Sequence, residues 1–317
     1  MKHDQGESWL KRLCRSGKLN RSEVGDDESS FLSAMTEWGI AYSLSDQHIA
    51  LKTDLQLIDA QQFETDMTSV LGSRFKCHYR LVTRSTNTDV LDYYERFHRP
   101  CVAIAEMQTA GKGRRGNHWV SPFARNIYCT IGVPKRIRAH ILGLLSIVTG
   151  IALCRALEAC GVGGVQVKWP NDLYFQRQKL GGILIESKPL GTDEYLVAIG
   201  FGINVKMSAE DLAAIPQAAT SIELINSDSL SRSAILLEAI EQVVVLIDSF
   251  DETEIPWLID EFNAHDALQG QRICATTAER SIYGLNAGID STGQLQLDTE
   301  QGRQTFSAAE ISLRGVY

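Results

Sequence analysis

The segment Gly111-Lys-Gly-Arg-Arg-Gly116 places three cations among three glycines within six residues. Glycine lets the backbone pass close to a ligand, and cations neutralise an anionic one. The segment matches the pattern G-x-G-x-x-G, but a dinucleotide-binding turn also needs an acidic residue about 20 residues later, where Lys135 and Arg136 stand. A P-loop is excluded because Asn117 and His118 occupy the positions of its lysine and hydroxyl residue. The segment therefore predicts a loop that wraps an anionic ligand, with a solvated basic turn as the alternative.

Polar residues on both sides of this loop lie at the ends of expected strands. Downstream, Lys168-Trp-Pro-Asn-Asp172 forms a turn between two β-rich runs, which places an amide and a carboxylate where a metal ion or polar ligand can be held. Lys179 enters the next strand beside Gly181 and Gly182, which allow a ligand to approach closely. Upstream, Ser85-Thr-Asn87 separates a strand from a helix, where it can cap the helix and bind a ligand. Each segment alone also has an ordinary structural explanation.

In this order the segments resemble the biotin protein ligase family. The resemblance is strong over residues 77–207, where it is carried by Ser85-Thr-Asn87, Gln108, the Gly111–Gly116 loop with Trp119-Val-Ser-Pro-Phe123, Lys168–Asp172, Lys179-Leu-Gly-Gly-Ile-Leu184 and Gly200-Phe-Gly-Ile-Asn204. It implies an ATP-dependent enzyme that converts biotin to biotinyl-5'-AMP and transfers the biotin to a lysine of the biotin carboxyl carrier protein of acetyl-CoA carboxylase. Lipoate ligases share a related fold. The loop and the 168–172 segment together favour biotin over lipoate.

The resemblance also implies a role for each matching residue. Lys179 would hold the biotin carboxylate and stabilise charge in both transfers, while Arg114 and Arg115 would fold over the ligand as a lid. The expected biotin-binding residues are Ser85, Thr86, Asn87, Gln108, Lys112, Gly113, Arg114 and Lys179. The expected ATP or adenylate contacts are Gly111, Gly116, Trp119, Asn171, Asp172 and Asn204, with Mg²⁺ bound at Asp172. The reaction needs no enzyme nucleophile, which agrees with the lack of a recognisable Cys/His or Ser/His/Asp arrangement.

The chain departs from the family at one position of the loop. Lys112 stands where the common form has arginine. Lysine keeps the charge but lacks the planar fork that makes bidentate contacts. We expect weaker retention of the adenylate without loss of activity, which a single-turnover comparison of adenylate leakage with Lys112→Arg would test.

The hydrophobic patterns predict an α/β or α+β domain with much antiparallel pairing, and the family resemblance implies an α+β fold with a central mixed or antiparallel sheet. Strands are expected at 77–82, 101–106, 127–133, 165–169, 172–175, 181–187 and 196–202, and helices at 87–97, 139–160 and within 230–265. From Gly270 onward, short strands separated by glycines suggest a small barrel, and Glu310-Ile-Ser-Leu-Arg314 is similar to the SH3-like domain of bacterial biotin ligases. We therefore expect three domains: a winged-helix-like domain at 1–62, the catalytic domain at 63–268 and the SH3-like domain at 269–317.

The composition is that of an ordinary packed protein. The 317 residues are 44% hydrophobic and 22% charged, with a net charge of -8, so no general attraction to nucleic acid or anionic membranes is expected. The longest uncharged run, 139–154, is too short to cross a bilayer. The seven cysteines form no C-x-x-C pair, which favours reduced thiols in a cytoplasmic protein. A homodimer formed through the central sheet is implied by the family alone.

The N-terminal 62 residues leave DNA binding open. Helices are expected at 8–19 and 26–38, followed by a hairpin around Ser45 and Asp46, an outline that resembles the winged helix of ligases that also repress biotin synthesis genes. The second helix begins with three acidic residues and has no Lys or Arg, whereas reading helices need cations or amides. The stretch between Gly17 and Gly39 is also short for two helices. A winged-helix relic is the preferred interpretation, and a biotinyl-AMP-dependent repressor is the alternative.

Overall fold

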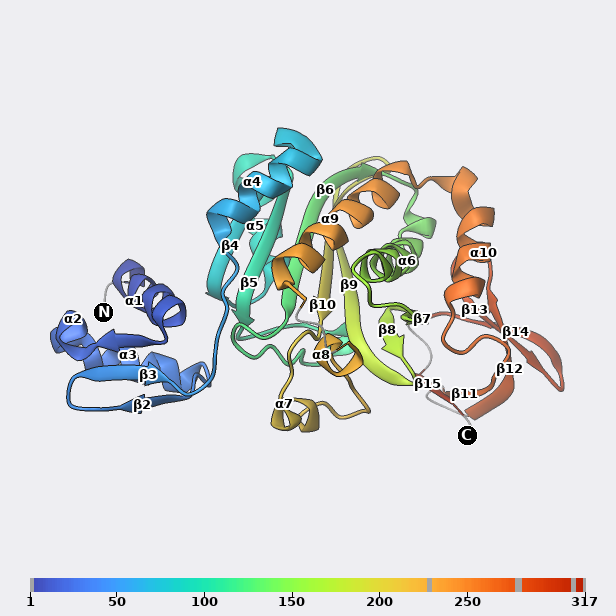
Figure 1. The fold of residues 1–317 in the computed structure, drawn as a ribbon. Helices are drawn as coiled ribbons and strands as arrows, with labels where there is room; N and C mark the ends of the chain where they lie inside the picture. Colours follow the sequence, from blue (N-terminus) through green and yellow to red (C-terminus); the bar gives the residue numbers. More distant parts are fainter. Residues whose placement is uncertain (1–2, 227–229, 277–280, 309–311, 316–317) are drawn as a thin grey trace.

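The computed structural model describes residues 3–226, 230–276, 281–308 and 312–315. The chain passes from an N-terminal group of helices and strands, through a central sheet, to a second sheet at the opposite end of the molecule (Figure 1). Glu310 and Ile311, which begin the C-terminal motif, lie outside the described residues.

The N-terminal group holds three helices and a three-stranded antiparallel sheet of order β1-β3-β2. Its elements are α1 (His3–Ser16), β1 (Lys18–Asn20), α2 (Arg21–Val24), α3 (Glu28–Glu37), β2 (Tyr42–Leu44) and β3 (His48–Leu51). The first helix ends earlier than expected because Gly17, at φ +71°, breaks it and Lys18–Asn20 pair with β3. The expectation that 17–39 is too short for two helices is wrong, since α2 has only four residues. The predicted hairpin is confirmed.

The central sheet has seven strands in the order β4-β5-β6-β10-β9-β8-β7. They are β4 (Lys76–Thr83), β5 (Cys101–Gln108), β6 (Ile127–Arg136), β7 (Gln166–Lys168), β8 (Asp172–Phe175), β9 (Gln178–Gly191) and β10 (Glu194–Ile203). Only β4 and β5 pair in parallel, joined by the crossover helix α5 (Thr86–Phe97), and all other neighbours are antiparallel. The expected mixed α+β architecture is confirmed.

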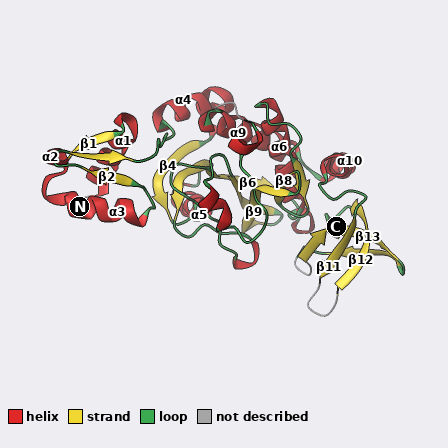
Figure 2. Ribbon diagram, turned by 60° about the horizontal axis from the view of Figure 1, so that its bottom comes forward, coloured by secondary structure: helices red, strands yellow, loops and turns green. Residues whose placement is uncertain are grey.

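Helices cover the two faces of this sheet unequally. Figures 1 and 2 show α4 (Ala60–Leu71), α6 (Leu144–Ala159) and α9 (Arg232–Ser249) along one face and α5 on the other. Helix α6 is apolar on all sides and almost wholly buried, as expected for a helix between a sheet and a second helix. The observed helix is shorter than the predicted 139–160, because residues 139–141 form a separate 3-10 turn. Two short helices, α7 (Ala209–Ala213) and α8 (Ile222–Ile225), follow β10.

The alternation of side chains along β9 and β10 makes the two faces chemically different. Ile199, Phe201 and Ile203 point into the main core, whereas the residues between them are glycines. Gly200 pairs with Thr130 on one side and Leu184 on the other, and Gly202 pairs with Gly182. The α5 face of the sheet consequently carries a trough where side chains are missing.

A five-stranded antiparallel sheet of order β14-β13-β12-β11-β15 forms the C-terminal end. It follows α10 (Ile255–His265) and comprises β11 (Arg272–Thr276), β12 (Ser281–Ile289), β13 (Leu295–Thr299), β14 (Gly302–Phe306) and β15 (Ser312–Gly315). Asp266 fastens this sheet to the central one: Ala267 N donates to Val167 O at 2.9 Å, and Asn286 Nδ2 donates to Asp266 Oδ2 at 2.6 Å. Burial raises the pKa of the Asp266 carboxyl from 3.8 to about 6, although bonds from Leu268 and Asn286 oppose the shift.

This buried carboxyl should make stability depend on pH. Because its folded-state pKa lies above its unfolded value, the folded protein binds the proton more tightly, and the free energy of unfolding falls as pH rises from about 4 to about 6. A shift of about two units corresponds to roughly 3 kcal/mol. We expect Asp266→Asn to lack this dependence, so that urea unfolding of the two proteins differs by a pH-dependent amount. Parallel stability profiles of both proteins between pH 4 and 7 would show that Asp266 does not cause it.

All seven cysteines are free thiols, and burial raises the pKa of Cys14, Cys101 and Cys154 to about 12. Among the residues that the structure describes, no helix combines the length and apolar character needed to cross a bilayer.

Candidate active site

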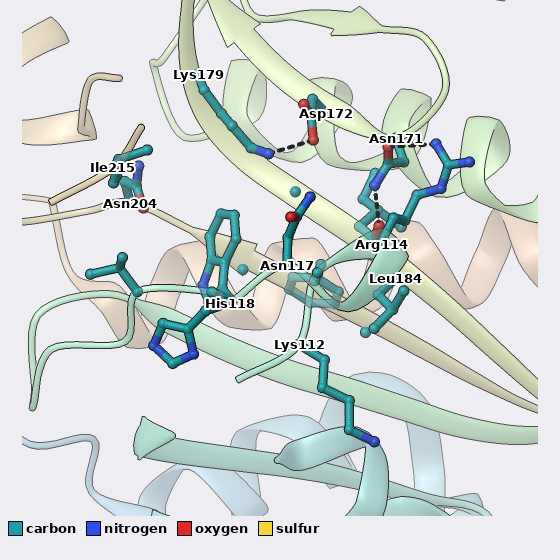
Figure 3. Close-up of a pocket in the computed structure, with 18 of the residues that line it drawn as sticks. Lys112, Arg114, Asn117, His118, Asn171, Asp172, Lys179, Leu184, Asn204 and Ile215 are labelled. Atoms are coloured by element: carbon teal, nitrogen blue, oxygen red, sulfur yellow. Dashed lines mark hydrogen bonds and ion pairs between the residues drawn. The ribbon is translucent and has the colours of Figure 1, made fainter. Parts of the chain in front are cut away.

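A cavity of about 500 Å³ lies on the α5 side of the central sheet, beneath the Gly111–Gly116 loop. Figure 3 shows Lys179, Asp172, Asn171 and Arg114 at one end of it. The structure brings together thirteen of the predicted residues in its lining: Ser85, Thr86, Asn87, Gln108, Lys112, Gly113, Arg114, Arg115, Trp119, Asn171, Asp172, Lys179 and Asn204. These residues come from the start of α5, strands β5, β8 and β9, and the loops that contain 112–119, 171 and 204, so the fold itself assembles the cavity.

Lys179 is an enclosed cation of the cavity. Its Nζ lies 2.7 Å from Asp172 Oδ1 and 5.4 Å from the centre of the Trp119 ring, and its side chain is 15% exposed. The backbone of Lys179 bonds to the segment 218–220 through Ala218 O and Thr220 N, both at 2.9 Å. Its position is therefore fixed from two directions. A partly desolvated ammonium at this point can stabilise negative charge that develops on a ligand.

The turn 169–172 is held just as firmly beside it. Asn171 Nδ2 donates to Ile183 O at 2.7 Å, and Trp169 Nε1 donates to Gly293 O at 2.9 Å, which joins the turn to the C-terminal sheet. Lys168 lies next to it; burial lowers the pKa of its ammonium, Asp172 opposes this, and Lys179 lowers it further. The turn thus presents an amide and a carboxylate in a surrounding dominated by cations.

The Gly111–Gly116 loop forms a short hairpin over the cavity. Gly113 N donates to Asn117 O at 2.7 Å and Trp119 N donates to Gly111 O at 3.0 Å. The tip contains Arg115 at φ +56°, a backbone conformation that residues other than glycine rarely adopt. A Cβ at Gly111 would lie 2.8 Å from Trp119 O, so only glycine fits there. The hairpin holds its arginines away from the sheet.

Both tip arginines reach the C-terminal sheet region. Arg114 Nη2 and Arg115 Nη2 donate to the carbonyl of Ala308 at 2.8 and 2.9 Å, and Arg114 Nη1 contacts Asn171 Oδ1 at 3.4 Å. Burial lowers the pKa of the Arg114 guanidinium, and Arg115 beside it adds to this shift, while Asp172 opposes it. Two cations are therefore held over the end of the cavity that contains Lys179.

The opposite end of the cavity is polar but carries few charges. Gln108 Oε1 accepts from Thr86 N at 3.0 Å, and Asn87 Nδ2 donates to Glu186 Oε2 at 2.7 Å. Ser85 precedes α5 at its N-cap, but its hydroxyl makes no capping hydrogen bond. Thr86 and Asn87 are less than 5% exposed. This end suits a neutral ligand group with several hydrogen-bonding atoms.

Two buried polar atoms in the cavity lining have no protein partner among the described residues: Trp119 Nε1 and Asn204 Oδ1. One can only donate and the other can only accept a hydrogen bond. The Trp119 ring fills the space above Gly202, whose Cβ would lie 2.6 Å from the ring. The segment 214–217 lines the cavity near Asn204, and Figure 3 shows Ile215 beside Asn204. A planar ligand group with both donors and acceptors would satisfy these atoms.

Gly111 and Gly116 do not line this cavity. They line a second cavity of about 760 Å³, which also contacts the other residues of the loop and Leu184, Ile185 and Glu186. Asp172, the predicted magnesium ligand, is paired with Lys179, and the described residues contain no cluster of three or more His, Cys, Asp or Glu side chains. Asp172 could therefore hold Mg²⁺ only together with oxygen atoms of a ligand.

Comparisons with known proteins identify the family. The family model "Biotin/lipoate A/B protein ligase family" matches residues 79–204, and "Biotin protein ligase C terminal domain" matches 269–314. A biotin acetyl-CoA-carboxylase ligase of Paracoccus denitrificans is 32% identical over 74% of this chain and 98% of its own. This chain belongs to the biotin protein ligase family. The bifunctional ligase/repressor BirA of Escherichia coli is 29% identical over 89% of this chain and 87% of its own.

Solved biotin protein ligases share the fold. The enzyme of Aquifex aeolicus, in complex with biotin and ATP, superposes with a TM-score of 0.64 over 76% of this chain and 99% of its own, at 24% identity. The mixed central sheet and the antiparallel C-terminal sheet described above are thus a biotin protein ligase architecture.

Sequence reasoning assigned no role to two residues whose side chains contact the lining residue Asn87. Thr130 lies on β6 opposite Gly200, and Glu186 on β9 contacts both Asn87 and, at 3.9 Å, Lys112. The alternation of β6 and β9 could have placed both on the α5 face. Nothing in the Ala-Ile-Pro-Gln sequence of 214–217 signals a ligand contact.

Proposed function

We propose that the protein is an ATP-dependent biotin ligase, which activates biotin as biotinyl-5'-AMP and passes the biotin to a lysine of the carrier protein of acetyl-CoA carboxylase. The observation that carries this proposal is the cavity itself, which has a neutral polar end at Asn87 and a cationic end at Lys179. Biotin has the same polarity, with an uncharged ureido ring at one end and a carboxylate at the other. The likeness to the Paracoccus ligase supports the carrier protein as acceptor.

The chemistry requires charge stabilisation twice. A carboxylate is a poor acyl donor, so its oxygen attacks the α-phosphorus of ATP and pyrophosphate leaves; the amine of the acceptor lysine then attacks the acyl carbon and AMP leaves. Negative charge builds on phosphoryl oxygens first and on the acyl oxygen second. Lys179 Nζ, held by Asp172 at 2.7 Å, would meet both, and Arg114 would share the first.

The residues present also fit the nucleotide. Trp119 offers a ring surface and an unpaired N–H, and Asn204 offers an unpaired acceptor, which suit the face and edge of adenine. Asp172 and the Asn171 amide oxygen are ligands of the type that Mg²⁺ accepts beside substrate phosphates. When bound, Mg²⁺ would neutralise phosphate charge. Gly111 and Gly116 would act by shaping the loop and not by touching the adenylate.

The lid role of the loop follows from its contacts. Arg114 and Arg115 are held on the Ala308 carbonyl above the cationic end, so the C-terminal part helps to keep the loop over the cavity. A covered site shields the reactive adenylate from water. We assign the domains as 1–62, 63–268 and 269–317, with a C-terminal SH3-like fold, which the match to the biotin protein ligase C-terminal domain supports.

Biotin-dependent exchange of labelled pyrophosphate into ATP tests the first half-reaction alone. The proposed function predicts exchange when biotin is present and none without it. Exchange that lipoate supports and biotin does not would assign the protein to lipoate ligation instead.

Repression of biotin synthesis genes is a second candidate function, favoured by the likeness to BirA. The order α1-β1-α2-α3-β2-β3 fits a winged helix. Its helix α3, however, contains no Lys or Arg. Three cations outside that helix pair with acidic side chains: Arg21 Nη2 lies 2.8 Å from Glu28 Oε1, Arg12 pairs with Glu23, and Lys11 with Glu7. We therefore propose a winged helix that no longer reads DNA.

A gel shift distinguishes the two interpretations of the N-terminal part. The probe is the promoter of the organism's own biotin synthesis genes, with biotin and ATP present. We expect no sequence-specific retardation, because helix α3 has no Lys or Arg with which to contact bases or phosphates. Retardation that requires biotin and is lost on an unrelated sequence would establish the repressor function.

A further inference from the structure

The polar end of the cavity contains a chain of short hydrogen bonds centred on Asn87. The Asn87 side chain spans the gap between β6 and β9: Thr130 Oγ1 lies 2.6 Å from Asn87 Oδ1, and Asn87 Nδ2 lies 2.7 Å from Glu186 Oε2 and 3.3 Å from Leu184 O. Thr130 is fully buried and Asn87 is 4% exposed. Sequence reasoning assigned a role to neither Thr130 nor Glu186.

The donors and acceptors of this chain allow only one orientation of the Asn87 amide. A carboxylate and a backbone carbonyl can only accept hydrogen bonds, so the NH2 group of Asn87 must face Glu186 and Leu184. Its carbonyl oxygen then faces Thr130, whose hydroxyl has a single proton to donate. Thr130 Oγ1 also lies 2.8 Å from Thr86 Oγ1, and Thr86 Oγ1 lies 3.2 Å from Gln108 Oε1. Because the Thr130 proton goes to Asn87, the single hydroxyl proton of Thr86 is donated either to Thr130 or to Gln108. Glu186 and Thr130 thus fix Asn87 from opposite sides.

The fixed carbonyl of Asn87 lies over Gly200 at the wall of the cavity. A carbonyl oxygen accepts two hydrogen bonds, and Thr130 occupies one of them. On the neighbouring strand, a Cβ at Gly200 would overlap Asn87 Oδ1, so the carbonyl oxygen itself fills the space that a side chain would take there. Asn87 and Gly200 both line the cavity. The polar end therefore presents an acceptor that needs an N–H or O–H donor from the ligand.

We propose that Glu186 and Thr130 are positioning residues that set the ligand specificity of this cavity by holding the Asn87 carbonyl toward the ligand. The inference rests on the proposed function and deepens it: the site selects a ring that carries N–H donors, such as a cyclic urea, over a ring of similar size without them, such as a dithiolane. A site built to pair with a donor rejects analogues that lack it, because a buried acceptor is then left unpaired.

The test combines substitutions at both ends of the chain. Thr130→Val removes the hydroxyl at similar volume, Thr130→Ser restores it, and Glu186→Gln removes the charge that fixes the amide. We expect Thr130→Val and Glu186→Gln each to raise the KM for biotin about 10-fold, with kcat and the KM for ATP within 2-fold of the unchanged protein. Thr130→Ser should restore most of the affinity. The preference for biotin over lipoate, as a ratio of kcat/KM, should fall in both impaired variants.

Two further measurements separate this role from a merely structural one. Because both residues act through Asn87, the double variant should raise the KM for biotin by no more than about the larger of the two single effects. If the two residues acted independently, the two increases in KM would multiply. Thr149, a fully buried threonine of α6 that bonds only within its helix, gives the control Thr149→Val, which should leave the KM for biotin unchanged.

The outcomes overturn either the inference or the function on which it rests. An unchanged KM for biotin in Glu186→Gln and Thr130→Val, or an equal rise in the KM for ATP, overturns the inference while biotin ligation stands. If Thr130→Val does not fold, Glu186→Gln and Thr130→Ser decide alone: a Glu186→Gln protein with unaltered biotin affinity and ligand preference rejects the proposal. Failure of the unchanged protein to use biotin rejects the proposed function.

Discussion

A Lys179→Met variant is expected to activate biotin 10²- to 10³-fold more slowly than the unchanged protein, the usual effect of removing one preorganised charge-stabilising group. The ammonium of Lys179 is enclosed by Trp119 and Asp172. In the proposed function it stabilises the negative charge that develops when the carboxylate of biotin attacks the α-phosphorus of ATP. Biotin-dependent exchange of pyrophosphate into ATP measures the effect directly. Transfer from pre-formed biotinyl-5'-AMP should slow as well, because charge also develops on the acyl oxygen.

The controls distinguish lost charge stabilisation from a disturbed cavity. Lys188→Met changes an exposed lysine of the same strand, which pairs with Glu95, and should leave the rate unaltered. The double variant Lys179→Met with Asp172→Asn removes the carboxylate that the single variant leaves without its partner. If Lys179→Met activates biotin at more than a tenth of the normal rate, Lys179 does not have the role assigned to it.

An alanine in place of either glycine of the trough on β10 should weaken the binding of one ligand and leave the other largely unaffected. Gly200→Ala would place a methyl group against Asn87 Oδ1, and Gly202→Ala would place one 2.6 Å from the Trp119 ring. We expect Gly200→Ala to raise the Kd for biotin at least 100-fold and Gly202→Ala to raise the Kd for ATP by a similar factor. Isothermal titration calorimetry with each ligand separately measures both constants.

The two glycine variants control for each other because they lie two residues apart on the same strand. Gly191→Ala, at the exposed end of β9, where a Cβ meets nothing closer than 3.7 Å, should change neither constant. Equal losses of biotin and ATP binding in both trough variants would show that the substitutions disrupt the sheet, and that the cavity does not have the two separate ends inferred here.

The sequence predicted strands β5, β6 and β10 well because each is a nearly continuous apolar run. Strand β9 is the instructive exception, since it extends to Gly191 through Pro189, beyond the expected end at 187. Its neighbour β8 pairs with it only as far as Gly182. The later residues of β9 therefore have one unpaired edge, where proline is tolerated.

The cavity was predictable only in part. The motifs supplied the residues of the loop, the turn at 168–172 and the start of α5, since each is marked by glycine, proline or a capping residue. The contact of Arg114 with Ala308 joins residues 194 positions apart, and no local pattern encodes it. Thr130 and Glu186 escaped notice because alternation reports which face a side chain occupies, while the reach of Asn87 between two strands depends on the missing side chain of Gly200.

The short helix α2 in the N-terminal part could not be predicted from the periodicity of the sequence. A four-residue helix such as α2 has no periodicity to detect, so the stretch between Gly17 and Gly39 looked too short for two helices. The structure also stacks Trp38, which caps α3, on Phe123 with the ring centres 6.2 Å apart. The segment that follows the Gly111–Gly116 loop thus contacts the N-terminal part, which the sequence did not predict.

Transfer of labelled biotin to a biotin carrier domain, in the presence of ATP and Mg²⁺, tests the central claim most directly. The full chain should transfer the label to the acceptor lysine of the carrier domain, and replacing that lysine by arginine should abolish labelling. Labelled lipoate should give no product under the same conditions. A carrier domain that stays unlabelled with biotin, while a lipoyl domain becomes labelled with lipoate, would contradict the account.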